Sequence, residues 1–196
     1  MTGSPPRLVL ASSSRYRKAL LDRLGLPYVS VSPDIDESAL PGEIPDVTVR
    51  RLALSKAQRV AADFPEALII GSDQVAVLEG RVLGKPGNHD AAAAQLQAMS
   101  GSETLFHTAL VLLDAASGGS DSAVVPTKVR MRTLSAAQIE RYLRRDEPYD
   151  CAGSAKIEAL GITLVESVHS SDPTALIGLP LIALTGMLLR AGIELP

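Results

Sequence analysis

The sequence predicts an α/β protein built on a mixed, twisted sheet with helices on both sides. Two observations carry this prediction: strand and helix patterns alternate at both ends of the chain, and hairpin signals fill its middle. A third observation concerns the domains. No linker-like composition interrupts the 196 residues, which favours a single domain with two lobes over two independent domains.

The first half of the chain reads as alternating strands and helices. Its apolar runs are short enough for strands, and its helical spacings end at Gly or Pro. Asp46 is expected to cap the longest helix, and Gly71 with Ser72 to break the strand before them. The expected elements are strands at 8–11, 28–31 and 67–70, helices at 15–24 and 46–62, a loop at 32–45 and a loose tail at 1–6.

The second half reads as hairpins followed by helices. Glu79-Gly80 is a hairpin signal between two short strands, and Ser135 with Gln138 forms a capping box. The expected elements are strands at 75–78, 81–83, 104–113 and 124–133, and helices at 90–99, from 135 onward and from 179 to 192.

The bulk composition limits the partners and the compartment. The formal net charge is −3, which does not favour binding to nucleic acid or to an anionic membrane. No apolar run approaches the roughly eighteen residues of a membrane-spanning helix. The single cysteine, Cys151, excludes an internal disulfide and suits a reducing compartment. We therefore expect a cytoplasmic protein.

Two charged residues follow the apolar strand. Asp73 stands at its expected carboxyl end, and Lys85 lies between a glycine and a proline. Ligands of α/β sheets gather outside the carboxyl ends of strands, so this acid is placed to serve as a base or a metal ligand. The alternative is a turn cap for Asp73 and a surface position for Lys85.

Three other segments hold polar residues that suit phosphate or metal. Ser12 to Arg17 joins a strand to a helix, where N–H groups, hydroxyls and a guanidinium favour an anion, although a plain serine cap also fits. The acidic run 34–37, which ends at Glu37, suits Mg²⁺ or Mn²⁺ or is merely solvated. Lys56 shares an apolar helical stripe and either reaches the rim or enters a polar cavity. The other members of that stripe are Val49, Leu52 and Val60.

The segment 150–158 mixes small and polar residues, which is typical of a tight connection and also permits close approach to a ligand. Cys151 is not expected to be a nucleophile, because no histidine stands in a recognisable partner pattern. Phosphate-loop, dinucleotide, zinc and serine-hydrolase motifs are absent. The spacings alone therefore suggest phosphoryl chemistry with a divalent ion.

Seven segments, taken in order, resemble the Maf family of nucleoside triphosphate pyrophosphatases. They are LASSSRYR, DIDE, the R-x-A-x-x-K-A pattern at 51–57, GSDQV, LGKP, CAGSAKIE and GLPL. The resemblance runs from about Leu8 to Gly192. It implies a Maf/ITPase-like fold with two lobes flanking a central cleft, often dimeric. It also implies hydrolysis of a nucleoside triphosphate between the α and β phosphates with a divalent cation (Mg²⁺, Mn²⁺ or Co²⁺).

The resemblance also assigns roles by position. Asp73 would be the general base, and Glu37 and Asp73 the metal ligands. Charge developing on the phosphates would be neutralised by basic side chains. The triphosphate cradle would consist of Ser12, Arg17, Lys56 and Lys85.

Three residues resemble the branch of the family that takes 7-methyl-GTP: Tyr16, Gln74 and Glu158. N7-methylated guanine is positively charged, so the Tyr16 ring could stack on it. Glu158 could accept hydrogen bonds from the guanine N1–H and N2 amine. The sequence departs from the family pattern at two positions. Arg15 stands where a proline is common, and Ala155 stands where an aromatic residue is frequent. The smaller side chain of Ala155 would loosen the base pocket.

The leading hypothesis is therefore an enzyme that converts 7-methyl-GTP to 7-methyl-GMP and diphosphate and clears modified nucleotides. Its expected partner is the small nucleotide, with neither nucleic acid nor membrane, and a homodimer is left open. The alternatives are a pyrimidine (dTTP or UTP) triphosphate pyrophosphatase and a nucleotide-binding regulator of septum formation or cell division. A regulator need not keep a general base, so the intact set of Glu37, Lys56, Asp73 and Lys85 favours catalysis.

Overall fold

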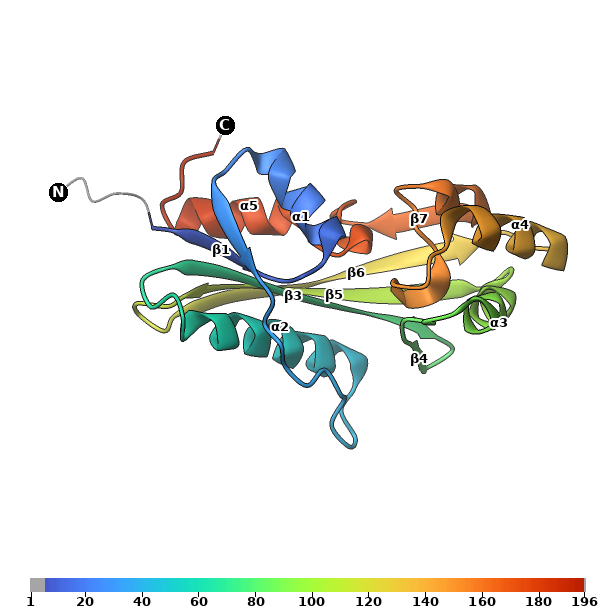
Figure 1. Cartoon of the computed structure of the whole chain (residues 1–196), viewed down its shortest axis with the longest axis horizontal. Coiled ribbons are helices and arrows are strands. Elements are labelled where there is room, and N and C mark those ends of the chain that lie inside the picture. Colours follow the sequence, from blue (N-terminus) through green and yellow to red (C-terminus); the bar gives the residue numbers. More distant parts are fainter. Residues whose placement is uncertain (1–5, 196) are drawn as a thin grey trace. The chain divides into compact units, whose positions relative to one another are not determined.

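A computed structural model of the chain describes residues 6–195 (Figure 1). The strands are β1 Leu8–Ala11, β2 Tyr28–Val31, β3 Leu68–Leu78, β4 Arg81–Leu83, β5 Glu103–Asp114, β6 Ser120–Met131 and β7 Val165–Ser170. The α-helices are α1 Arg15–Leu21, α2 Pro45–Ala61, α3 His89–Met99, α4 Ala136–Asp146 and α5 Leu181–Arg190. Short 3-10 helices occur at Asp22–Leu24, Ala152–Ser154, Leu160–Leu164 and Ala175–Ile177.

The strands form one seven-stranded sheet in the order β2-β1-β3-β5-β6-β7, with β4 paired to β3. β1 runs parallel to β2 and β3, whereas the β3–β4 and β6–β7 pairs are antiparallel. This mixture of pairings in a sheet with five helices confirms the predicted α/β class. The predicted loose tail lies outside the described residues except for Pro6.

The residues divide into two compact units. The first contains residues up to Asp73, 108–125 and 172 onward, and the second contains 74–107 and 126–171. In the first unit α2 lies on one face of β1 and β3, and α1 and α5 lie on the other (Figure 1). Helices therefore cover both faces of this part of the sheet, as predicted.

Strand alternation builds the core of the first unit. Successive strand residues point to opposite faces, so Leu8 and Leu10 of β1 pack with Leu68 and Ile70 of β3 on the face that α1 and α5 cover. Strand β5 and the helices supply further members of this apolar cluster. Its helical members are Leu20, Leu21, Leu181, Leu184, Met187 and Leu188.

Gly71 allows α2 to lie directly against β3. A Cβ atom at this position would sit 2.1 Å from the carbonyl oxygen of Ala53 and 3.1 Å from the Cβ of Ala57. Only a residue without a side chain fits there, and only small residues fit opposite it on the helix. Lys56 lies between these two alanines in the R-x-A-x-x-K-A pattern, so the close contact carries this lysine to the strand.

Four predictions about elements are corrected by the structure. Gly71 and Ser72 do not break their strand: β3 is continuous, because Gly71 serves packing rather than a turn. Asp46 is not the cap of α2; Ile44 holds that position, and Pro45 begins the helix with its fixed φ. β6 begins at Ser120 rather than 124, and β7 was not predicted.

Two local signals of the second unit are confirmed. Glu79 and Gly80 have φ of 48° and 78°, which is the backbone of a tight hairpin turn between β3 and β4. Ser135 and Gln138 form the capping box at the start of α4. Helix α3 packs against α4 and against the turn at Ala152–Ser154. In the described part of the chain no helix has the length and apolar character needed to cross a membrane.

A buried acid fixes the amino end of α5. The Asp172 side chain, 2% exposed, accepts hydrogen bonds from the backbone N–H of Ile182 and Ala183 at 2.7 and 3.2 Å. Thr174 accepts a third, from Leu181, at 2.7 Å. The helix begins at residue 181 without a side-chain cap on its flanking Pro180, so these contacts satisfy amide donors that would otherwise have no acceptor.

We expect Asp172→Asn to lower the free energy of unfolding by about 1.5–3 kcal/mol, because an amide presents N–H donors where the helix offers only donors. Urea denaturation monitored by circular dichroism measures the change. The exposed Asp63→Asn serves as the control and should shift stability by less than about 0.5 kcal/mol. Equal stability of the two variants would contradict the capping role.

Candidate active site

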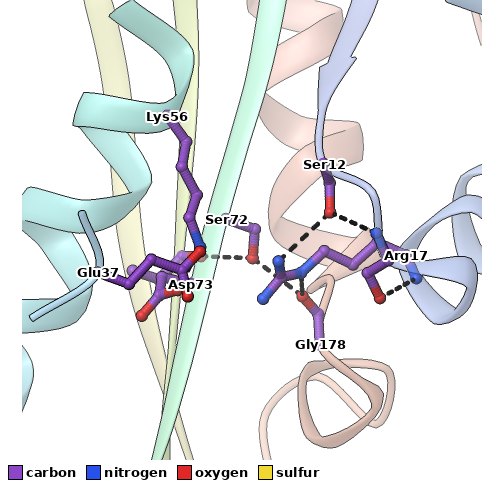
Figure 2. A network of polar contacts seen from close by, with 9 residues as sticks. Ser12, Arg17, Glu37, Lys56, Ser72, Asp73 and Gly178 are labelled. Carbon is purple, nitrogen blue, oxygen red and sulfur yellow. Dashed lines mark hydrogen bonds and ion pairs between the residues drawn. The ribbon is translucent and has the colours of Figure 1, made fainter. Parts of the chain in front are cut away.

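A buried lysine joins two carboxylates on the face of β3 that α2 covers. Lys56 Nζ lies 2.6 Å from Oδ1 of Asp73 and 2.7 Å from Oε1 of Glu37 (Figure 2). Lys56 and Asp73 are 4% and 7% exposed, whereas the Glu37 side chain is half exposed. Of the two alternatives for Lys56, the structure shows the polar one: the ammonium turns inward. Two carboxylates compensate its burial.

The Ser72 side chain points to the opposite face of the same strand. Its hydroxyl oxygen lies 2.7 Å from the carbonyl oxygen of Ala109 and 2.9 Å from that of Gly178, and its single hydrogen is shared between them. The side chains of neighbouring strand residues point to opposite faces. Asp73 therefore contacts Lys56 of α2, whereas Ser72 contacts the segment before α5. Neither Ser72 nor Gly178 was predicted as a site residue, although Ser72 lies within the GSDQV segment and Gly178 within the GLPL segment.

Arg17 of α1 is anchored beside Ser72. Its Nε donates to the Gly178 carbonyl at 2.9 Å, and its Nη1 donates to the Ser12 hydroxyl at 3.4 Å. Ser12 follows the last residue of β1 and is buried; its hydroxyl also accepts from the N–H of Ser14. Gly178 has φ of +120°, which a residue with a side chain rarely adopts. The carboxyl end of β1 and this glycine thus set the direction of the guanidinium.

The acidic and basic groups on the two faces interact electrostatically. Burial lowers the pKa of Arg17, while the carboxylates of Asp73 and Glu37 act in the opposite direction and favour its charged form. Figure 2 shows Arg17 and Ser12 on one side of β3, and Lys56 with its two carboxylate partners on the other. Because β1 ends at Ala11, its last backbone pair with β3 is Leu10 with Ile70, and Asp73 lies beyond that pair. The groups therefore gather around the carboxyl end of β1.

The first unit brings together five of the predicted site residues: Ser12, Arg17, Glu37, Lys56 and Asp73. The prediction that Asp73 would follow the end of its own strand was wrong, since β3 continues to Leu78. The strand that ends here is β1.

Three other predicted site residues, Gln74, Lys85 and Glu158, belong to the second unit. Their convergence with the first unit stays a prediction.

Tyr16, the predicted stacking residue, already contacts a cation. The guanidinium carbon of Arg15 lies 4.8 Å from the centroid of the Tyr16 ring, and Arg15 Nη2 donates to the Tyr16 hydroxyl at 2.7 Å. The ring therefore takes part in a cation–π contact within the chain itself. The departure from the family pattern at position 15 thus falls directly on the residue predicted to stack on the base.

The acidic run 34–37 does not form a metal cage. Among residues 6–195, no three or more His, Cys, Asp and Glu side chains are grouped so as to hold a metal ion. Asp36 instead accepts from the N–H of Ser38 at 2.9 Å, and the contacts with Ser38 lower its pKa. The carboxylates that could bind a metal ion are therefore those of Glu37 and Asp73, which both contact Lys56. Mg²⁺ is commonly held by one or two carboxylates, waters and substrate phosphates, so these residues fit that mode of binding.

Cys151 lies in surroundings that disfavour its thiolate form. Burial raises the pKa of this thiol to about 12, with a further contribution from the neighbouring Asp150 carboxylate, and the thiol donates to the carbonyl of Pro148 at 3.4 Å. Nucleophilic attack requires the thiolate. This environment agrees with the expectation that Cys151 is no nucleophile.

We expect the native protein to react with Ellman's reagent at pH 8 at least about 100-fold more slowly than the urea-unfolded chain, because a free cysteine has a pKa of about 8.5. Absorbance at a fixed reagent concentration follows the reaction, and the unfolded chain provides the rate of the exposed thiol. Equal rates in the two states would contradict the protected environment.

A comparison with known protein families identifies the class of protein that carries this fold and this lysine–carboxylate site. The model of the Maf-like protein family matches residues 7–191, so the chain belongs to this family. The predicted family is thereby confirmed.

Individual relatives cover nearly the whole chain. A protein of Cupriavidus pinatubonensis called 7-methyl-GTP pyrophosphatase is 56% identical over 193 residues, covering 98% of this chain and 97% of the relative. Proteins with the same name from Thiobacillus denitrificans and Aromatoleum aromaticum are 55% and 53% identical. Those matches cover 99% and 97% of this chain, and 96% and 98% of the two relatives. The relatives carry the name of the branch that the sequence predicted.

Proposed function

We propose that this protein is a pyrophosphatase that hydrolyses 7-methyl-GTP to 7-methyl-GMP and diphosphate. The observation that carries the proposal is Lys56, buried and in contact with both Asp73 and Glu37, near the carboxyl end of β1 where Arg17 is anchored. The similarity along nearly full length to three proteins named for this activity supports the choice of substrate.

The proposed chemistry begins with a water molecule beside Asp73. Lys56 contacts Oδ1 of this carboxylate, which leaves Oδ2 to accept the proton of the water. The water oxygen then bonds to a phosphorus of the α–β anhydride. The bridging oxygen leaves with the electrons of the broken P–O bond, so one product is the monophosphate and the other is diphosphate.

The basic side chains stabilise the charge that this reaction moves. Lys56 holds Asp73 in place, and the fixed guanidinium of Arg17 is oriented by Gly178 and Ser12 to bind phosphate oxygens. Both cations are held rigidly before the substrate arrives, so little reorganisation is needed in the transition state.

Charge balance supports a divalent cation as cofactor. Arg17 and Lys56 together carry two positive charges, which the two carboxylates of Glu37 and Asp73 offset, so these four groups alone cannot neutralise a triphosphate. Glu37 and Asp73 would hold the ion, and the ion would neutralise phosphate charge. Lys85 is proposed to add a further positive charge from the second unit.

The base would be recognised by Tyr16, Gln74 and Glu158. A methylated guanine carries a positive charge that an aromatic ring and a carboxylate both attract, whereas a pyrimidine carries none. A single cysteine suits a reducing compartment, so we propose that the protein is located in the cytoplasm.

The test is a pyrophosphate-release screen of 7-methyl-GTP, GTP, UTP, dTTP and CTP, each with Mg²⁺, Mn²⁺ or Co²⁺ and with EDTA. We expect 7-methyl-GTP to give the highest kcat/KM, with equal amounts of 7-methyl-GMP and diphosphate, and EDTA to abolish release. A higher kcat/KM for UTP or dTTP would indicate the pyrimidine branch instead. Nucleotide binding without any release would indicate a regulator.

A further inference from the structure

Glu37 reaches its buried partner from a segment without regular secondary structure. Between the end of β2 at Val31 and the start of α2 at Pro45 the chain forms neither helix nor strand. The Glu37 side chain is half exposed, yet its carboxylate lies 2.7 Å from the ammonium of Lys56. A flexible, solvated glutamate would lose considerable side-chain freedom in this position, so other contacts must hold the segment.

Arg51 of α2 supplies those contacts. Its Nε and Nη2 donate to the two carboxylate oxygens of Glu43, both at 2.7 Å, which is the two-pronged arrangement that only arginine forms with a carboxylate. The same Nη2 donates to the carbonyl oxygen of Ser38 at 3.0 Å, one residue after Glu37. Arg51 thus holds both ends of the turn 38–43.

Glu43 closes the turn from inside. Its side chain is only 6% exposed, and Oε2 accepts from the N–H of Leu40 at 3.0 Å. The N–H of Glu43 in turn donates to the carbonyl of Leu40. The hydrogen bonds from Arg51 lower the pKa of Glu43 to about 2, so the carboxylate stays ionised throughout the neutral range. A covered, ionised carboxylate with this many donors has a defined geometry.

We propose that Arg51 and Glu43 are positioning residues, whose ion pair fixes the turn 38–43 so that Glu37 is held against Lys56 and Asp73. The inference rests on the proposed function, in which Glu37 acts beside Asp73. Arg51 and Lys56 lie on the same helix, which Gly71 seats on β3, so one rigid element sets both the lysine and the turn that brings its second carboxylate.

The neighbouring pair on α2 is a matched control. Arg50 Nε lies 2.8 Å from Oδ2 of Asp46, but both side chains are well exposed and the pair joins two residues of the same helix. An exposed contact of this kind within one helix has little energetic weight. Arg50→Gln removes the same charge as Arg51→Gln from the adjacent position, without touching the turn.

The test is a double-mutant cycle on the full-length protein, with kcat and KM measured for 7-methyl-GTP. We expect Arg51→Gln and Glu43→Gln each to lower kcat by about 10- to 100-fold with a much smaller change in KM, since a displaced Glu37 weakens the chemical step. Arg51→Lys should also lower kcat, because it keeps the charge and loses the fork. Arg50→Gln should stay within about twofold of the unchanged protein.

The cycle with Glu37→Gln separates positioning from a merely structural role. If Arg51 acts through Glu37, adding Arg51→Gln to Glu37→Gln should lower kcat by less than about twofold, because contacting residues are not additive. Fully multiplied effects would overturn the inference. Full activity of Glu37→Gln would also overturn the inference. If the protein without substitutions released no pyrophosphate from any nucleotide, the proposed function itself would be refuted.

A readout without activity guards against variants that fold poorly. The Leu40 N–H donates a hydrogen bond to Oε2 of Glu43. Hydrogen exchange of this amide should accelerate in Glu43→Gln and Arg51→Gln and stay unchanged in Arg50→Gln. Unchanged protection of Leu40 in Glu43→Gln and Arg51→Gln would show that the ion pair does not hold the turn, and would overturn the inference.

Discussion

Asp73→Asn is expected to lower kcat for 7-methyl-GTP by a factor of about 10²–10⁴, the usual contribution of a general base. An amide cannot take a proton from water, but it has nearly the same shape and can still accept from Lys56 Nζ, which lies 2.6 Å from Oδ1. KM should change much less, because the basic cradle remains. Initial rates of pyrophosphate release over a range of nucleotide concentrations separate the two constants.

Two measurements make this expectation specific. Asp63→Asn removes a carboxylate from an exposed ion pair with Arg59 and should leave kcat unchanged. Circular dichroism and thermal unfolding should show that Asp73→Asn is folded, since Lys56 keeps its contact with Glu37. A folded Asp73→Asn variant with undiminished turnover would remove the general base from the proposal, whatever the family of the chain.

Periodicity placed Lys56 on an apolar helical stripe, but it left open whether the ammonium reaches the rim or turns inward, and it did not identify the partners of the lysine. The helical stripe of α2 placed this lysine among residues that are all buried in the structure. Its contacts with Asp73, 17 positions away, and with Glu37 depend on how the helix lies on the sheet, which no local pattern reports. The resemblance supplied what spacing could not, because it relates segments that are distant in the chain.

Arg51 and Glu43 show a different limit. Both belong to a stretch where charged residues are frequent, and their spacing of eight positions corresponds to no helical contact because Glu43 precedes the helix. Asp172 was missed for a similar reason: it lies ten and eleven positions before the amides that it caps, at the end of an intervening turn. Such tertiary caps have no local sequence signature, unlike the capping box at Ser135.

Gly71 was misread because the same residue type serves two purposes. A glycine after an apolar run is typical of a turn, so Gly71 was predicted to end the strand. In the structure it stays extended within β3, and its missing side chain makes room for the backbone of Ala53. Glycine also allows two elements to approach closely. This role can be predicted only when the small residues that face the glycine are known.

Gly71→Ala is consequently expected to have the largest effect on stability of any single-methyl change in the first unit. The added Cβ would lie 2.1 Å from the carbonyl oxygen of Ala53, which is backbone and cannot rotate away, so helix and strand must separate. We expect a loss of about 3 kcal/mol in the free energy of unfolding, the upper part of the usual range for overpacking. Urea denaturation at neutral pH measures it.

The same separation should act on catalysis, because it moves Lys56 away from Asp73. A fold that survives Gly71→Ala should therefore show a kcat lowered by about 10²-fold, the effect of a displacement near 1 Å at a reacting centre. Gly186→Ala in α5 is the matched control. Its new Cβ would meet only the flexible end of Arg190, and alanine favours the helix, so stability should rise by about 0.5–1 kcal/mol. Equal stability and turnover of Gly71→Ala and Gly186→Ala would contradict this explanation. It would show that the close packing of α2 on β3 is not what places Lys56 beside Asp73.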